Sequence, residues 1–166
     1  MSERLWAPWR FEYVQNADDK NKGGCIFCDL PEQENDRDNL VLYRASKVFV
    51  LLNAYPYTSG HLMVAPYRHG QDIGPLDNDE LLQVNQMIQH AVAWIDKAFQ
   101  PEGYNIGVNM GRAAGAGIPK HVHWHVVPRW SGDTNFMTTV GDVRVIPQDL
   151  RTTWDLLRAI IDRGDG

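Results

Sequence analysis

The stretch Gly115-Ala-Gly-Ile-Pro-Lys-His121-Val-His-Trp-His-Val-Val-Pro128 decides the fold, because three histidines alternate there with apolar residues behind a glycine-rich segment. In an extended strand successive side chains point to opposite faces. His121, His123 and His125 are therefore expected on one face, roughly 7 Å apart along the strand, while the apolar residues between them enter a core. The stretch predicts a strand from His121 to Pro128 that presents a row of imidazoles.

Length and composition fit a single compact domain with a core of its own. The chain has 166 residues, of which 43% are hydrophobic and 22% charged, near the average for globular proteins. No apolar run approaches the ~18 residues of a membrane helix, and the N-terminus lacks the apolar run of a secretory signal. We therefore expect a cytoplasmic protein with no membrane partner. A formal net charge of −5 disfavours general attraction to nucleic-acid polymers, so an anionic ligand needs a local site.

The order of the predicted elements indicates an α+β fold rather than strict βαβ alternation. A long helix is expected to begin at the acidic cap residues 77–80 and to end at residues 100–103, because apolar residues recur between them at helical spacing. Pro147 can open a final helix that ends at Gly164. Short apolar runs predict the strands 40–44, 47–52, 60–65 and 104–110, with a short extended segment at 142–146.

We expect one domain over residues 1–166, organised in three parts. Residues 1–24 form an aromatic N-terminal arm and a polar loop, residues 25–130 the core that carries the functional residues, and residues 131–166 a C-terminal tail and helix. The arm is expected to pack as a clamp over the core or a dimer partner, since isolated aromatic residues usually pack.

Three imidazoles on one face permit two kinds of chemistry. They can bind one transition metal together, or they can divide the work of nucleophile, orienting group and ligand. The glycine-rich segment 111–117 lies directly upstream, with Arg112, Lys120 and Arg129 nearby. Glycine N–H groups and basic side chains favour a phosphate ligand, and a neutral imidazole can attack phosphorus. The alternatives are a plain glycine turn and a row of histidines without a function.

The run His121-Val-His-Trp-His-Val-Val127 resembles the signature of the histidine triad (HIT) family, and the following Pro128-Arg129 is also typical of that family. The resemblance continues at Asn53 and Gly60-His61. The stretch 105–136 looks most like bacterial members grouped with diadenosine tetraphosphate hydrolases and phosphorylases. The resemblance implies a HIT-like antiparallel half-barrel sheet of about five strands, a long helix, a C-terminal helix and a homodimer.

By the same resemblance, His123 is the catalytic nucleophile. It would attack the α-phosphate of a dinucleoside polyphosphate of the diadenosine tetraphosphate class, or of a related nucleotide ester, and form a nucleotidyl-histidine. His125 would contact the phosphate and the leaving group. The implied substrate-binding residues are Leu52, Asn53, His61, Asn109, Arg112, Gly115, Ala116 and Gly117.

One departure from the family pattern leaves the acceptor of the nucleotidyl group open. Many relatives carry glutamine after the loop's Ala-Gly, whereas Ala114-Gly115 is followed here by Ala116-Gly117. Backbone donors would then replace a side-chain amide at the phosphates. The acceptor can be water, which makes a hydrolase, or inorganic phosphate, which makes a phosphorylase. Two other interpretations are a nucleotide-binding sensor with little turnover and a metalloenzyme that uses all three imidazoles on one catalytic metal.

The two cysteines, Cys25 and Cys28, have a spacing that suits either two thiolate ligands or a redox pair. Tetrahedral zinc needs four ligands. In metal-binding members of the family the partners are the histidine of a Pro-x-x-His segment and the first histidine of the triad, which match His69 and His121. The resemblance thus implies a structural Zn²⁺ site. We disfavour a redox pair or plain buried thiols, because no helix pattern starts at Cys25 as in a thioredoxin-like site.

Overall fold

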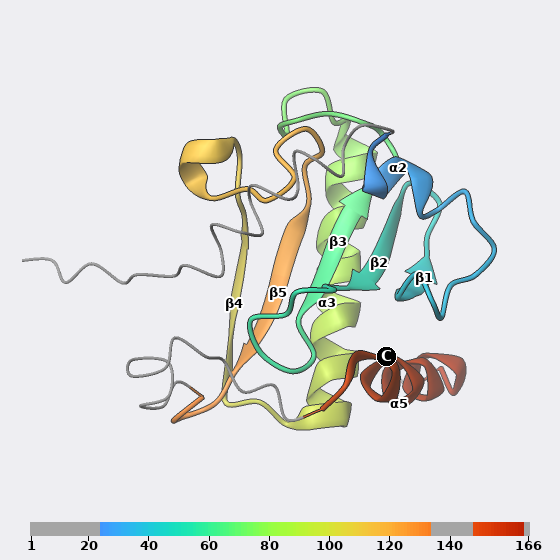
Figure 1. Ribbon diagram of the computed structural model, residues 1–166, viewed down its shortest axis with the longest axis vertical. Helices are drawn as coiled ribbons and strands as arrows, with labels where there is room; N and C mark the ends of the chain where they lie inside the picture. Colours follow the sequence, from blue (N-terminus) through green and yellow to red (C-terminus); the bar gives the residue numbers. More distant parts are fainter. Residues whose placement is uncertain (1–23, 134–147, 165–166) are drawn as a thin grey trace, which may run out of the picture.

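The computed structural model describes residues 24–133 and 148–164. Five strands form one open antiparallel sheet in the order β1-β2-β3-β5-β4, with α3 and α5 on one side (Figure 1). The described helices are α2 (Ile26–Asp29), α3 (Asn78–Phe99) and α5 (Leu150–Asp162), with the short 3₁₀ turn η1 (Arg112–Ala114). The strands are β1 (Val41–Arg44), β2 (Val48–Leu52), β3 (Leu62–Pro66), β4 (Gly103–Val108) and β5 (Trp124–Arg129). The predicted α+β class is confirmed.

Part of the predicted organisation falls outside the described residues. This holds for the N-terminal arm up to residue 23, for the extended segment 142–146 and for Pro147, the predicted start of the final helix. The division into arm, core and tail therefore stays a prediction. Within the described part of the chain, no helix has the length and apolar character needed to cross a membrane.

The two central strands are buried on both faces, which explains why their sequences are continuous apolar runs. Val48 and Val50 of β2 pack with α3 and α5 in the larger core cluster. Phe49 and Leu51 point to the opposite face, where they pack with Phe27 of α2 in a second cluster. The sheet thus separates a helix-side core from the face on which the histidines lie.

The long helix begins where the sequence predicts, at a reciprocal cap. The Asp77 carboxylate accepts a hydrogen bond from the Glu80 N–H at 2.7 Å. The Glu80 carboxylate accepts one from the Asp77 N–H at 2.8 Å. Both bonds satisfy N–H groups that the first helical turn leaves without partners. Glu80 is 5% exposed, so this acidic side chain is part of the packed structure.

Strand β5 begins at Trp124, three residues after the predicted start at His121. The pairing with β3 ends at Val64 opposite Trp124. Beyond it Pro66 has no N–H with which to continue the ladder, and its carbonyl instead accepts a hydrogen bond from His121 Nε2 at 2.8 Å. The predicted alternation is still kept, because Val126 lies in the helix-side core and His123 contacts Phe27 on the opposite face.

The prediction that no helix starts at Cys25 was wrong. Cys25 is the N-cap of the single turn α2, and four residues are too few to produce a helical periodicity in the sequence. The side chain of Phe27, which is fully buried, anchors this turn to the histidine face of the sheet. The residues around the two thiols therefore decide between a metal site and a redox pair.

Candidate active site and metal centre

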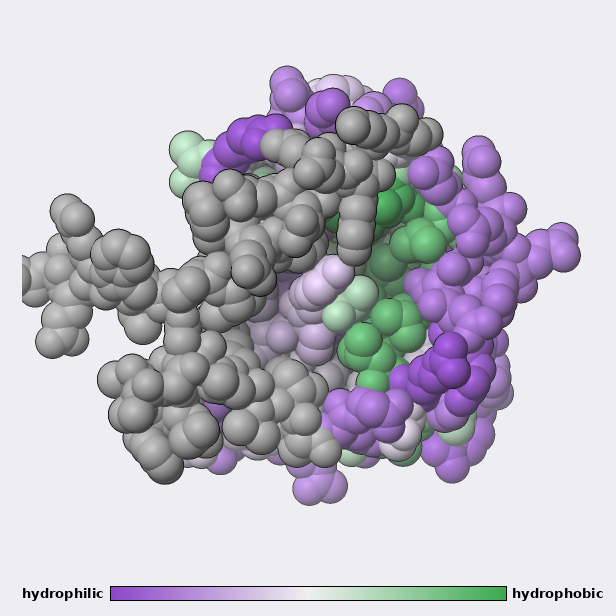
Figure 2. All heavy atoms as spheres, in the orientation of Figure 1, coloured by the Kyte–Doolittle hydropathy of each residue, from purple (hydrophilic) through white to green (hydrophobic). Residues whose placement is uncertain are grey.

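The sheet face opposite α3 carries a hollow with largely apolar walls (Figure 2). His123 and His125 form one side of it, and Asn53, Tyr55 and Tyr57 border it at the end of β2. Such a combination of apolar walls and a few polar groups is typical of a small-molecule site. The apolar residues that line it are Ile26, Leu30, Leu40, Leu51, Leu52, Met63 and Ile118.

The structure brings together only part of the predicted substrate-binding set. Leu52, Asn53, Gly115 and Gly117 border the hollow, and His61 lies behind His125. Among the described residues, Asn109, Arg112 and Ala116 are not part of its lining.

Side-chain alternation explains which apolar residues the sequence prediction missed. Leu52 belongs to the helix-side core, whereas Leu51 and Met63 belong to the cluster on the histidine face. Met63 is the pairing partner of His125. Counting in steps of two from the histidines across the paired strands would have identified these lining residues.

The imidazole of His123 is held in one tautomer by the backbone. Its Nδ1 lies 2.9 Å from the carbonyl oxygen of His121, and a carbonyl only accepts, so Nδ1 carries the proton and Nε2 carries the lone pair. The side chain is 4% exposed, and this burial lowers its pKa, although the bond to the His121 carbonyl opposes the shift. Phe27 packs against the ring at 4.6 Å between centroids. His123 is therefore an oriented imidazole that favours the neutral form and has its lone pair on Nε2, the chemistry that a nucleophile requires.

A chain of hydrogen bonds orients the other two histidines of the site. The Nδ1 atom of His61 accepts from the Tyr57 N–H at 3.1 Å and lies 3.4 Å from the amide nitrogen of Asn53. Its proton therefore sits on Nε2, which is 3.0 Å from Nδ1 of His125. A neutral His125 that accepts at Nδ1 carries its own proton on Nε2. The chain thus leaves His125 with an N–H donor at Nε2, and its ring centroid lies 4.9 Å from that of His123.

The glycine-rich segment forms a tight turn beside the hollow. Gly111 and Gly115 adopt positive φ angles of 80° and 84°, which glycine tolerates best. The N–H groups of Gly115 and Ala116 donate to the carbonyls of Arg112 and Gly111. These two backbone donors therefore stabilise the turn in this conformation, rather than facing a ligand.

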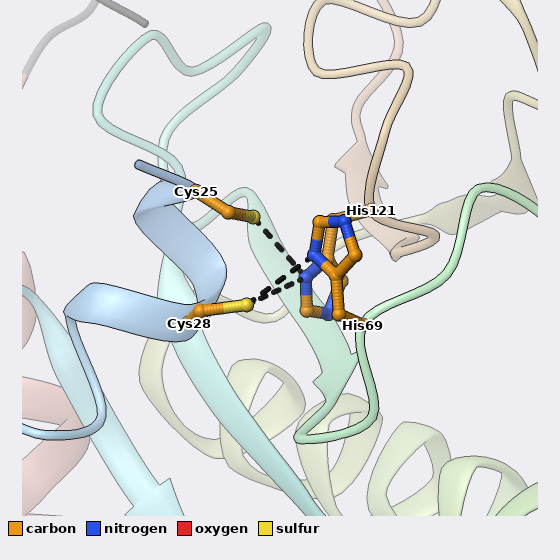
Figure 3. Close-up of side chains that lie close together, drawn as sticks. All are labelled: Cys25, Cys28, His69 and His121. Carbon is orange, nitrogen blue, oxygen red and sulfur yellow. Dashed lines mark hydrogen bonds between the residues drawn. The ribbon is translucent and has the colours of Figure 1, made fainter. Parts of the chain in front are cut away.

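Cys25, Cys28, His69 and His121 converge although they come from three separate parts of the chain (Figure 3). One turn of α2 brings the two thiols to the same side, since positions i and i+3 are neighbours on a helix. The Sγ atoms of Cys25 and Cys28 lie 3.3 Å and 3.6 Å from Nδ1 of His121. The Sγ of Cys28 is also 3.4 Å from Nδ1 of His69, and all four ligand atoms lie within 4.8 Å of one another.

The geometry of this cluster fits a tetrahedral metal ion. Zinc bonds of ~2.3 Å to sulfur and ~2.05 Å to nitrogen place the ligand atoms roughly 3.3–3.8 Å apart. The tautomer of His121 also fits, because its Nε2 donates to the Pro66 carbonyl and its Nδ1 lone pair is left facing the thiols. These four residues can hold a metal ion, and this coordination geometry favours a metal over a redox pair.

The thiol of Cys28 is poorly ionised without a cation. Burial, together with the neighbouring Cys25, raises the pKa of Cys28 to about 11. Metal ligation requires the thiolate, and a bound divalent cation reverses the effect of the surroundings. The same contacts argue against one catalytic metal on all three triad imidazoles, since His121 turns its Nδ1 to the thiols and His123 commits its Nδ1 to a carbonyl.

Comparison with protein-family models gives a match over residues 34–132 to the model described as the HIT domain. This segment contains His69 and the three triad histidines, whereas Cys25 and Cys28 lie before its start.

Curated relatives and a solved structure extend the match. A Mycobacterium tuberculosis protein named AP-4-A phosphorylase is 41% identical over 161 residues, covering 93% of this chain and 82% of that protein. A Schizosaccharomyces pombe protein named bis(5'-nucleosyl)-tetraphosphatase (asymmetrical) is 32% identical over 93 residues, covering 56% of this chain and 50% of that protein. A Zn-bound histidine triad family protein from Mycobacterium smegmatis superposes with a TM-score of 0.68 at 26% identity, covering 86% of this chain and 96% of that one.

Proposed function

Because the chain belongs to the HIT domain family, we propose that it is an enzyme that cleaves dinucleoside polyphosphates of the diadenosine tetraphosphate class. The reaction proceeds through a nucleotidyl group on His123. The observation that carries this proposal is the bond from His123 Nδ1 to the His121 carbonyl, which leaves the lone pair on Nε2 of a residue that lines the hollow.

In the first step the Nε2 lone pair of His123 attacks the α-phosphorus. A phosphorus–nitrogen bond forms, and the bond from the α-phosphorus to the bridging oxygen breaks. For diadenosine tetraphosphate, AMP stays on His123 and ATP leaves. The bond to the His121 carbonyl stabilises the imidazolium that forms. The Nε2–H of His125 donates a hydrogen bond to the departing oxygen, which leaves as a phosphate oxygen of the ATP anion.

The second step transfers AMP to an acceptor, and we propose inorganic phosphate as that acceptor. A phosphate oxygen attacks the phosphorus, the phosphorus–nitrogen bond breaks, and ADP leaves with the free imidazole restored. Similarity to the mycobacterial protein named AP-4-A phosphorylase over most of both chains supports this choice. Attack by water would give AMP and define a hydrolase instead.

The nucleoside of the transferred AMP is proposed to occupy the hollow. Its apolar walls suit a planar base. Asn53 is proposed to face the ribose, and Gly115 and Gly117 to border the phosphates, since all three line the hollow.

Product analysis tests this function directly. The protein is incubated with diadenosine tetraphosphate, with and without inorganic phosphate, and a parallel sample is acid-quenched for mass spectrometry of its peptides. We expect ATP and ADP with phosphate, and an AMP adduct on the peptide that contains His123. AMP and ATP formed equally without phosphate would identify a hydrolase. Turnover with no adduct, even in a slowed variant, would contradict the covalent route, and nucleotide binding without turnover would favour a sensor.

We also propose that Cys25, Cys28, His69 and His121 hold a structural Zn²⁺. The cluster geometry supports this, as does similarity to the Zn-bound mycobacterial family protein. When bound, the ion would cross-link α2 to the segment before β5 and would take no part in the chemical step. Metal analysis of protein never exposed to a chelator should give one zinc per chain, and a content near zero would contradict the assignment.

We also propose that the protein is a homodimer in the cytoplasm. Strand β4 is an edge of the sheet, and Ile106 on it is 47% exposed, which suits pairing with a second copy. Metal-ligating thiols suit a reducing compartment. Light scattering after size exclusion should give twice the chain mass, and the substitution Ile106→Lys should shift it to the monomer.

A further inference from the structure

The short helix α2 belongs to two sites at once. Ile26 stands between the candidate metal ligands Cys25 and Cys28, and Leu30 follows two residues later. Ile26 and Leu30 both line the hollow. Ile26 is 43% exposed, so a ligand in the hollow can cover apolar surface that the protein alone leaves in water.

A helix this short needs contacts with the rest of the fold to keep its position. It has four residues, and its N-cap Cys25 makes no side-chain capping bond, while isolated turns of this length are unstable in water. Its described attachments in the fold are of two kinds. Phe27 and Leu30 pack in the cluster on the histidine face, and the pair of thiols meets His69 and His121.

The opposite wall of the hollow has separate support. Leu51 and Met63 lie on the central strands β2 and β3, whose register fixes them. His123 is oriented by its bond to the His121 carbonyl. Loss of the metal ion would therefore release mainly the wall formed by α2.

We propose that the metal ion positions this wall, so that occupancy of the metal centre sets the affinity of the hollow for adenine nucleotides. This inference rests on the proposed function, because it takes the hollow to be the nucleoside site. Ile26 and Leu30 then act as residues that the metal presents to the base. The metal centre is thereby coupled to substrate affinity without entering the chemical step.

Binding of AMP, measured by calorimetry, tests the coupling without relying on turnover. Zinc-loaded protein is compared with chelator-treated protein whose fold is checked by circular dichroism. We expect AMP to bind about tenfold more weakly after zinc removal, which corresponds to losing the apolar contacts of one side chain. Equal affinity in the two states would overturn the inference and leave the proposed function standing. No binding of AMP to zinc-loaded protein would overturn both.

Substitutions at matched positions locate the effect. Ile26→Ala in the zinc-loaded protein should weaken AMP binding about tenfold. Ile73→Ala, at an isoleucine that is 41% exposed and outside the lining of the hollow, should leave it unchanged. In zinc-free protein Ile26→Ala should add little, because the wall has already moved. If zinc removal and Ile26→Ala weakened AMP binding by fully additive free energies, the metal ion would not position the wall.

A reciprocal measurement covers the case in which zinc-free protein does not stay folded. If zinc raises the affinity for AMP, AMP must raise the affinity for zinc by the same factor. In equilibrium competition with a coloured chelator, the affinity for zinc should therefore be about tenfold higher at saturating AMP in the wild type, and nearly unaffected by AMP in Ile26→Ala. Equal zinc affinities with and without AMP in the wild type would overturn the inference.

Discussion

His121 and His123 are two residues apart and lie on the same face of the sheet, yet the structure prepares them for opposite tasks. His121 donates from Nε2 to the Pro66 carbonyl, which turns the Nδ1 lone pair to the thiols of Cys25 and Cys28. His123 donates from Nδ1 to the His121 carbonyl, which leaves its lone pair on Nε2. The comparison teaches that a backbone carbonyl, by selecting the tautomer, separates the proposed metal ligand from the proposed nucleophile.

The strongest way to break this comparison is to remove the nucleophile. His123→Ala should lower kcat/KM for diadenosine tetraphosphate by about 10⁴-fold or more, because no other histidine in the described part of the chain lines the hollow with its lone pair on Nε2. It should keep one zinc per chain, since the four cluster residues are intact. Steady-state kinetics and metal analysis of the same preparation provide both readings.

His90→Ala is the matched control, because His90 lies on α3 and contacts Trp94 away from the site. It should leave both turnover and zinc content unchanged. If His123→Ala lost its zinc as well, the two histidines would not have separate roles.

Removing a thiol tests the other residue of the comparison, His121, through the cluster to which it belongs. Cys28→Ser should release the metal ion and lower the melting temperature by roughly 10 °C, because the α2 segment then keeps only its apolar packing through Phe27 and Leu30. Differential scanning calorimetry with and without added zinc measures this. The wild type should show the same loss after chelation, and an unchanged melting temperature in both cases would refute a structural role for the cluster.

The division of roles could be predicted only in part from the sequence. The alternation of His121, His123 and His125 fixed their common face, and the family is confirmed by the matching domain model. The opposite tautomers were not predictable, because they depend on the carbonyls of Pro66 and His121 and thus on where β3 stops.

The lining of the hollow was the least predictable part. Ile26 begins α2 and Leu30 is its C-cap, and this turn is too short to give a periodic pattern. Leu51 and Met63 face the hollow through a strand register that no local sequence pattern reveals. Arg112 was expected at the phosphates from its position in the glycine-rich segment, but it lies on η1 and not in the lining of the hollow.

The hydrogen-bond chain behind His125 sets the tautomer of that residue, and this third tautomer offers a way to sharpen the comparison. His61→Ala removes the Nε2–H that His125 accepts and should lower kcat about 10²-fold, because His125 then no longer presents its proton to the leaving group. The effect should shrink to a few-fold with a dinitrophenyl ester of AMP, whose leaving group is much less basic than the terminal phosphate of ATP and departs without a hydrogen-bond donor. An equal loss with both substrates would indicate general damage to the site.

The smallest expected effect concerns how His69 is held, and it sharpens the comparison because His69 belongs to the candidate metal cluster and does not line the hollow. Arg68, the residue before His69, pairs with Glu80 at 2.8 Å, and this carboxylate also accepts from the N–H of Asp77. Glu80→Gln keeps an acceptor for the cap but loses the charge that binds Arg68. We expect zinc to transfer to a chelator about threefold faster, with kcat unchanged in the zinc-loaded enzyme.

Asp79→Asn is the control for this effect, because it removes a neighbouring charge whose side chain is 81% exposed. It should not change the rate of zinc transfer. If Glu80→Gln lowered kcat while zinc stayed bound, the influence of this ion pair would reach past His69 to His123. The metal site and the nucleophile would then be mechanically joined through the segment 121–123, in spite of their opposite tautomers.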